Sequence, residues 1–225
     1  MIITDDKGVE HHGFKKLLEQ PWERMSLWVS GGTDSAFGFW FMSKMLTEHP
    51  ELNKTITPVY IDVLPDKYGF QAFNYINDFV REEFPDAPIE ETLIFEHQPS
   101  PIYSKADRMN AIREELYEKH NIDMDIGFVT AVDKDFSPPI DKERLVDVEK
   151  RKSLASDKLF SPPRTPLHTI DKKGLAEQYR KYDLMESLYP YTKSCTATTR
   201  LPCGECFWCH EKAWAFGTMD KGIKL

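Results

Sequence analysis

The sequence lacks cysteine outside one short stretch, and it lacks both a long apolar run and an excess of positive charge. All four cysteines lie between positions 195 and 209, whereas a disulfide framework usually spreads its cysteines over a small secreted domain. No segment approaches the ~20 apolar residues that cross a bilayer, so we expect no membrane partner. Lys and Arg number 29 against 37 Asp and Glu, a net charge of −8, which argues against a general nucleic-acid-binding surface.

The first residues also lack the features of an export signal. Residues 1–7 contain neither a basic stretch nor an apolar stretch, so we expect a cytoplasmic protein. The composition, with 40% hydrophobic and 29% charged residues in a chain of 225, is that of a globular protein with a sizeable core.

The most informative motif is Ser30-Gly31-Gly32-Thr33-Asp34-Ser35, which follows the apolar residues 27–29 and precedes the helix-compatible residues 36–42. A strand, a glycine-rich turn and a helix in this order aim backbone N–H groups at a phosphate. The motif has neither the Gly-Lys-Ser/Thr that ends a Walker A loop nor the Gly-x-Gly-x-x-Gly of a dinucleotide fold. The sequence therefore predicts a phosphate-binding loop of another kind.

Predicted strands and helices alternate along the first 130 residues, which favours right-handed crossovers and a mainly parallel, doubly wound α/β sheet. In such sheets ligands bind beyond the carboxyl ends of the strands, where the glycine-rich motif lies. We expect the adjacent His11 and His12 at the surface. The charged segment 133–164 is interpreted either as a solvated helix or as a flap over the active site. The expected strands are 27–29, 57–63, 91–95 and 124–130, and the expected helices are 14–20, 34–49, 69–84 and 106–120.

A second motif lies near the end of the sequence, where four cysteines fall within fifteen residues: Cys195, Cys203, Cys206 and Cys209. Four thiolates satisfy a tetrahedral Zn²⁺ ion and leave no open position, so such a site is structural. An iron–sulfur cluster also uses four thiolates, and unmetallated core cysteines are a third alternative. The spacing favours zinc and leaves the other two open.

The glycine-rich motif resembles the pyrophosphate loop of the PP-loop ATP pyrophosphatase superfamily, whose members cleave ATP to AMP and pyrophosphate. Its combination with Ser194-Cys195, with Cys203-Gly204-x-Cys206-x2-Cys209 and with residues 213–216 is similar to the 7-cyano-7-deazaguanine synthase family of the queuosine precursor pathway. Residues 166–176 and 191–195 also resemble segments of that family. The likeness is strong in residues 27–37 and 160–216 and weak between them.

This resemblance implies an ATP-dependent C–N ligase. The enzyme would adenylate the carboxylate of 7-carboxy-7-deazaguanine and use ammonia to form the nitrile, releasing AMP and pyrophosphate, with ATP, Mg²⁺ and structural Zn²⁺ as cofactors. The partners would be the small-molecule substrate and ammonia, with a homodimer left open. We expect an amino-terminal extension at 1–25, an α/β ATP-binding domain at 26–165 and a small zinc-bound helical lobe at 166–225.

The motif and the resemblance together assign roles to particular residues. Asp34, Ser35 and Arg108 are the predicted catalytic residues, and Asp133 is a predicted substrate contact. Asp34 would help to hold Mg²⁺ or fix the loop, or it could instead cap the helix. Lys172 could either contact phosphate or be a solvated lysine. Gly127 would let ATP approach the backbone, or it is a simple turn glycine. The predicted ATP-binding residues are Ser30, Gly31, Gly32, Thr33, Asp34, Ser35 and Gly127.

Two departures from the family weaken the assignment of the substrate. The family's Tyr-Gly-Gln occurs here as Tyr68-Gly69-Phe70-Gln71, with one extra residue, and residues 135–139 replace its Tyr-Pro-Asp-Cys. Cleavage of ATP is therefore better supported than the identity of the base. The alternatives are the same adenylation with another product (an amide, another amine conjugate or a thiolated base) and a non-catalytic nucleotide-binding adaptor.

Overall fold

The computed structural model describes residues 2–5, 7–63, 66–98, 105–131, 136 and 164–218. Asp133 and most of the charged segment 133–164 lie outside the described residues, so neither interpretation of that segment is tested. Along the described parts of the chain, no helix combines the length and the apolar character that a membrane span requires.

The elements are β1 (Ile3–Thr4), β2 (Glu10–His11), α1 (Gly13–Leu18), β3 (Arg24–Trp28), α2 (Thr33–Glu48), η1 (Pro50–Leu52), β4 (Thr55–Val63), α3 (Lys67–Glu83), β5 (Leu93–His97), α4 (Lys105–Lys119), β6 (Met124–Ile126), α6 (Lys172–Lys181), α7 (Leu184–Ser187), η2 (Tyr189–Tyr191) and α8 (Phe207–Phe216).

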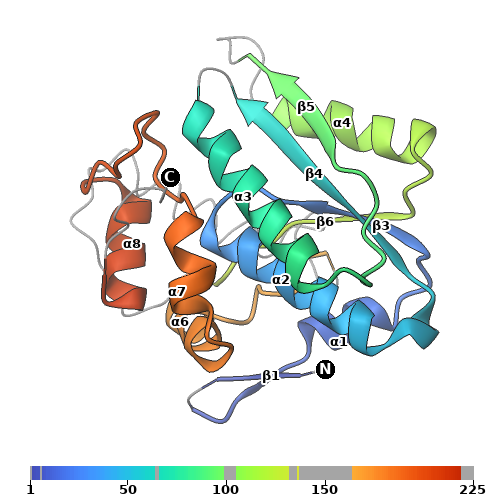
Figure 1. Ribbon diagram of the computed structural model, residues 1–225, viewed down its shortest axis with the longest axis horizontal. Helices are drawn as coiled ribbons and strands as arrows, with labels where there is room; N and C mark the ends of the chain where they lie inside the picture. The colour runs from blue at the N-terminus through green and yellow to red at the C-terminus, as the bar shows by residue number, and fades with distance from the viewer. Residues whose placement is uncertain are drawn as a thin grey trace.

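A four-stranded sheet with the order β5-β4-β3-β6 forms the centre of the molecule, and all its described strand pairs are parallel. The chain moves from β3 through α2 to β4 and through α3 to β5, and α4 then returns it to β6 on the other side of β3. Helices α2 and α3 cover one face of the sheet and α4 covers the other (Figure 1). The predicted α/β fold with a mainly parallel sheet is confirmed.

Alternating side chains of β4 explain why both faces of the sheet are covered. Ile56 and Tyr60 point into the larger apolar cluster beneath α2 and α3. Val59 and Ile61 point the other way and pack in the cluster that contains Ile112 of α4. A strand with apolar residues on both faces is stable only in the middle of a layered α/β structure.

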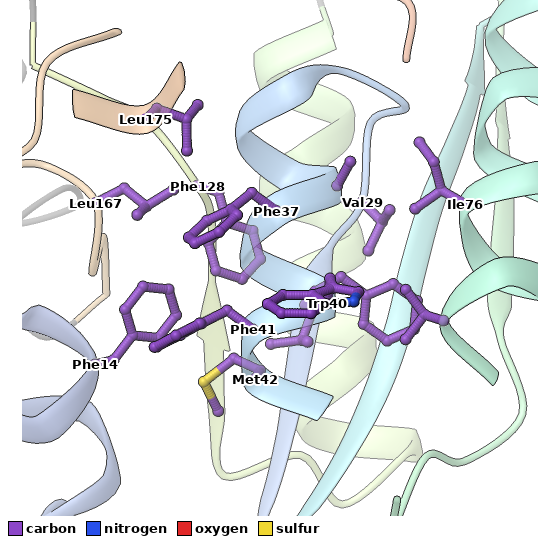
Figure 2. Packing of buried hydrophobic residues seen from close by; sticks show 14 of the residues in the cluster. Phe14, Val29, Phe37, Trp40, Phe41, Met42, Ile76, Phe128, Leu167 and Leu175 are labelled. Atoms are coloured by element: carbon purple, nitrogen blue, oxygen red, sulfur yellow. The ribbon is translucent and has the colours of Figure 1, made fainter. Parts of the chain in front are cut away.

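Helix α2 is apolar around most of its circumference because other elements surround it. The rings of Phe37 and Phe41 lie 5.5 Å apart, and Phe41 meets Phe14 of α1 at 4.7 Å between centroids (Figure 2). Gly38 allows the closest approach, since a Cβ atom there would lie 2.1 Å from Cδ1 of Phe128. This packing fixes the axis of the helix that follows the phosphate-binding motif.

Two short strands near the amino terminus were not predicted from the sequence. The short strands β1 and β2 pair antiparallel, and the carboxylate of Asp5 accepts hydrogen bonds from the backbone N–H groups of Lys7 and Val9 at 3.0 and 2.8 Å. His11 is buried between Asp5 and Thr169, with ring nitrogens 3.2 and 3.0 Å from their side-chain oxygens. The expectation of a surface histidine at this position was wrong, because these polar partners compensate its burial.

Strand β6 is shorter than predicted, ending at Ile126 rather than at residue 130. Beyond this point the backbone leaves β3 and finds other partners. The N–H of Gly127 donates to the carbonyl of Arg164 at 3.1 Å, and the N–H of Ala131 donates to the carbonyl of Ile170 at 2.7 Å. The order of the strands reverses between β3 and β6, and β6 ends early at this point. Doubly wound folds bind their ligands where the strand order reverses.

Candidate active site and metal centre

The six-residue motif forms a tight turn between β3 and α2. The Ser35 hydroxyl accepts a hydrogen bond from the N–H of Ser30 and donates to the carbonyl of Gly32, each at 3.1 Å. Gly32 is the N-cap residue of α2 and provides no side-chain hydrogen bond. Since the first N–H groups of a helix have no partner within it, this turn offers amide donors and the positive end of a helix dipole to an anion.

Gly31 occupies the most constrained position of the turn. Its φ angle is +84°, in the left-handed region that side chains disfavour. A Cβ atom there would lie 3.2 Å from Cβ of Ala72 and 3.3 Å from the carbonyl oxygen of Gly69. The first glycine of the motif and the first turns of α3 therefore determine how closely the backbone approaches a ligand.

Asp34 fastens the loop to two distant parts of the chain. One carboxylate oxygen accepts hydrogen bonds from the N–H and the hydroxyl of Thr130, at 3.2 and 3.1 Å. The other oxygen pairs with the ammonium of Lys172. The alternative in which Asp34 caps the helix was wrong, because Gly32 holds that position. Its predicted catalytic role stays a prediction.

Lys172 begins α6 and lies buried between two carboxylates. Besides Asp34 it faces Glu211 of α8, with its Nζ 3.5 Å from a carboxylate oxygen. Its side chain is only 6% exposed, so the interpretation as a solvated lysine was wrong. Tyr179 on the same helix donates its hydroxyl proton to the carbonyl of Thr33 at 2.8 Å, so α6 supports the loop at two points.

Lys193 is a second buried lysine beside the loop, and the sequence analysis did not identify it. Its backbone N–H donates to the carbonyl of Gly31 at 2.7 Å. Its ammonium donates to the carboxylate of Asp66 at 2.8 Å, and Asp66 also caps α3 by accepting from the N–H of Gly69. The available signal was its place two residues before the first cysteine of the metal motif.

Carboxylates also gather where β4 and β5 end, near the capped start of α3. Burial raises the pKa of Asp62 above its ordinary value, and the negative charges of Glu96 and Asp66 act in the same direction. A group of carboxylates near a phosphate-binding turn could help to hold a divalent cation, since Mg²⁺ is bound by one or two carboxylates together with substrate phosphates.

The remaining predicted site residues differ in how the structure places them. Among the described residues, none has an atom within 4 Å of a Cβ atom built on Gly127, and its predicted contact with ATP stays a prediction. Arg108 lies against β5, where its Nε donates to the carbonyl of Glu96 at 3.1 Å and its guanidinium lies 5.9 Å from the ring centroid of Phe95. These contacts place Arg108 beside the same strand ends as Asp62, not on the loop. Asp133 lies outside the described residues.

The four cysteines form the other centre, at the start of α8. Their sulfur atoms all lie within 4.8 Å of one another. The separations are 3.6 Å for Cys195 and Cys203, 3.9 Å for Cys203 and Cys209, 3.9 Å for Cys195 and Cys206, and 3.4 Å for Cys206 and Cys209. Four sulfurs at 2.3 Å from a tetrahedral zinc ion would lie about 3.8 Å apart. The set fits a single zinc ion, whereas a cluster with one thiolate on each of several irons would separate the sulfurs further.

The surroundings of the sulfurs also suit a cation. Backbone N–H groups of Cys203 and Cys206 point at the sulfurs of Cys195 and Cys203, each at 3.3 Å. The hydrogen bond from the backbone N–H of Glu205 lowers the pKa of Cys203 to about 6. Burial raises the pKa of Cys195 and Cys209, so a bound cation would be needed to hold all four as thiolates.

Comparisons with known proteins were made by sequence and by structure. No family and no curated protein matches the sequence. By structure, the chain is similar to an NAD+ synthetase from Burkholderia pseudomallei, with 12% identity and a TM-score of 0.34 over 89% of this chain and 77% of that one. It is also similar to an N,N'-diacetylchitobiose deacetylase from Pyrococcus horikoshii, with 13% identity and a TM-score of 0.30 over 71% of this chain and 66% of that one. Both scores are low, so neither likeness bears on the function of this chain.

Proposed function

We propose that this chain is a PP-loop enzyme that cleaves ATP to AMP and pyrophosphate while activating a carboxylate for attack by ammonia. The observation that carries the proposal is the turn at residues 30–35, which leads into α2. The N-cap residue of this helix is Gly32, which makes no side-chain hydrogen bond to the first N–H groups. Two buried lysines flank that turn: Lys172 contacts Asp34, and the backbone of Lys193 contacts Gly31. Amide donors at such a helix start suit a leaving pyrophosphate, and the two lysines hold the turn in place through these contacts.

The residues present match what the chemistry requires. A carboxylate is a poor electrophile until one of its oxygens becomes part of a good leaving group. Its oxygen attacks the α-phosphorus of ATP, the bond to the β-phosphate oxygen breaks, and pyrophosphate leaves. Ammonia then attacks the acyl carbon and AMP departs, which gives an amide. Positioning and charge neutralisation by the turn, with no covalent intermediate on the protein, are sufficient for these steps.

For the acyl substrate we propose 7-carboxy-7-deazaguanine, with the nitrile as product. The support is the pairing of the turn with the four-cysteine segment, in which Lys193-Ser194-Cys195 stands beside Gly31 and Gly32. A second ATP would activate the oxygen of the amide, and loss of AMP together with the amide protons would leave the nitrile. The zinc ion would hold the four cysteines and would contribute no step.

The substrate assignment is tested by incubating the protein with ATP, Mg²⁺, ammonium and 7-carboxy-7-deazaguanine. Pyrophosphate is measured by a coupled assay, and the deazapurine product is identified by mass. We expect pyrophosphate and nitrile from the wild-type protein and neither from Ser35→Ala, which loses the hydroxyl that closes the turn. Ser43→Ala is the matched control, because Ser43 is a buried serine on the same helix whose hydroxyl donates to Phe39 instead.

The possible products separate the alternatives. Pyrophosphate with an amide, or with another amine conjugate, would retain the adenylation and reject the nitrile. A thiolated base is disfavoured, because a sulfur carrier would need a cysteine outside the four that suit zinc and the sequence has none. If neither pyrophosphate nor AMP is produced although ATP binds, the chain is a nucleotide-binding adaptor and the proposed enzyme function is wrong.

A further inference from the structure

One lysine joins the two centres of this molecule. The backbone N–H of Lys193 donates to the carbonyl of Gly31, in the phosphate-binding turn. Its ammonium donates at 3.0 Å to the carbonyl of Cys195, the first residue of the four-cysteine set, and at 2.8 Å to Asp66. With its side chain only 6% exposed, Lys193 is held in this position by partners from three parts of the chain.

The contacts of Lys193 reach both sides of Gly31. Asp66 caps α3, and the first turns of that helix press on Gly31 through Gly69 and Ala72. A shift of Lys193 would therefore move the Gly31 carbonyl directly and would remove the cation from the carboxylate that caps the helix packed against it. Gly31 is the residue of the turn with the positive φ angle, so its peptide orientation is what such a shift changes.

A second connection runs in parallel through α8. Glu211 follows Cys209 by two residues in that helix and faces Lys172, which pairs with Asp34 of the turn. A metal ion that holds Cys195 and Cys209 thus fixes the anchor points of both connections. Only the Lys193 connection acts on the backbone of the glycine pair, where a phosphate would bind.

We infer that Lys193 is a positioning residue through which metal binding at the four cysteines and nucleotide binding at the turn reinforce each other. The inference rests on the proposed nucleotide site. Thermodynamic linkage requires the effect to be mutual: the factor by which zinc tightens nucleotide binding equals the factor by which nucleotide tightens zinc binding. Couplings between sites in proteins are commonly about 5- to 150-fold, and two short connections to one turn predict a factor of about tenfold.

The test measures both directions of the coupling. The dissociation constant of an ATP analogue with a methylene group between its α- and β-phosphorus atoms is measured by calorimetry, with Mg²⁺, on zinc-loaded and zinc-stripped protein. The affinity for zinc is measured by competition with a chromogenic chelator, with and without saturating analogue. We expect a factor of about tenfold in both directions for the wild type, and a clearly smaller factor for Lys193→Gln, which cannot pair ionically with Asp66 and keeps only the connection through Glu211 and Lys172.

Lys193→Arg restores a positive charge and several donors, so it should recover part of the coupling, which a loss of folding alone would not explain. Lys54→Gln is the matched control, since Lys54 is a buried lysine that donates to the carbonyls of Gln20 and Trp22 instead. If the stripped protein does not fold, the zinc competition on loaded protein still gives the coupling. Equal factors in wild type and Lys193→Gln would overturn the inference alone, whereas no analogue binding to zinc-loaded wild type would remove the proposed nucleotide site as well.

Discussion

Replacing Lys172 with methionine is the most direct test of how the loop is held. Methionine preserves most of the volume of the side chain and removes its charge. Lys172 is 6% exposed and faces the carboxylates of Asp34 and Glu211, which are 15% and 4% exposed. The substitution leaves both carboxylates in a poorly hydrated place without the cation between them.

The size of the effect follows from what each carboxylate keeps. Removing one partner of a buried ion pair costs about 3–5 kcal/mol, because the remaining charge stays desolvated. Asp34 still accepts two hydrogen bonds from Thr130, so we expect a loss near the lower limit, about 3 kcal/mol. For a chain of 225 residues, this corresponds to a fall in Tm of about 6–12 °C.

The assay is urea unfolding followed by tryptophan fluorescence, on Lys172→Met, Asp34→Asn and the double variant. The double variant should be more stable than the sum of the single changes predicts, since removing both charges of one pair leaves less uncompensated burial. Lys44→Met is the control: it breaks a helix-surface pair with Glu48 and should change stability by less than about 0.5 kcal/mol. A loss below about 1 kcal/mol for Lys172→Met, or strict additivity with Asp34→Asn, would refute the reasoning.

Three further predictions concern the core, the metal centre and pH. Gly38→Ala should cost about 1–3 kcal/mol, because its Cβ would overlap Phe128; an unchanged urea midpoint would contradict this. Cys206→Ala should abolish stoichiometric zinc binding and lower Tm, since metal-binding energy is folding energy at such a site; metal analysis and calorimetry that find both unchanged would reject structural zinc. Burial opposes ionisation of Asp125, but the hydrogen bond from Tyr117 and the charge of Arg113 outweigh it and lower the pKa. The contribution of Asp125 to the free energy of unfolding is therefore complete above its unfolded pKa of about 4 and is lost as pH falls through its lower folded pKa. On acid titration, the stability of Asp125→Asn should decline less steeply than that of the wild type.

Local patterns predicted much of the fold. The expected helices at 34–49, 69–84 and 106–120 lie within about two residues of the observed ends of α2, α3 and α4. The stripe of apolar residues located α3, which buries that face, whereas the glycine-rich motif and Pro50 bounded α2. The end of β6 could not be predicted in this way. Residues 127–130 are as compatible with a strand as those before them, and their departure depends on partners such as Arg164 and Asp34, which are distant in sequence.

In the candidate site, too, local patterns could be predicted from the sequence and contacts between distant residues could not. The turn at residues 30–35 and the four cysteines were identified because their residue types and spacings are local and chemically specific. The roles of Lys193 and Glu211 were missed because a buried charge is visible only when its partner is known. In α8, Glu211 stands among aromatic residues such as Phe207 and Trp214, and that unusual neighbourhood was the one available sign.

The spacing within α8 limits how this protein can vary in length. Each residue of an α-helix advances by about 100°, so Cys209 and Glu211 point about 200° apart, one toward the sulfur centre and the other toward Lys172. One inserted residue between them would rotate Glu211 away from its lysine while leaving the sulfur set intact. Added or lost residues are better tolerated between Ala197 and Leu201, an irregular segment whose tip exposes 61% of Leu201.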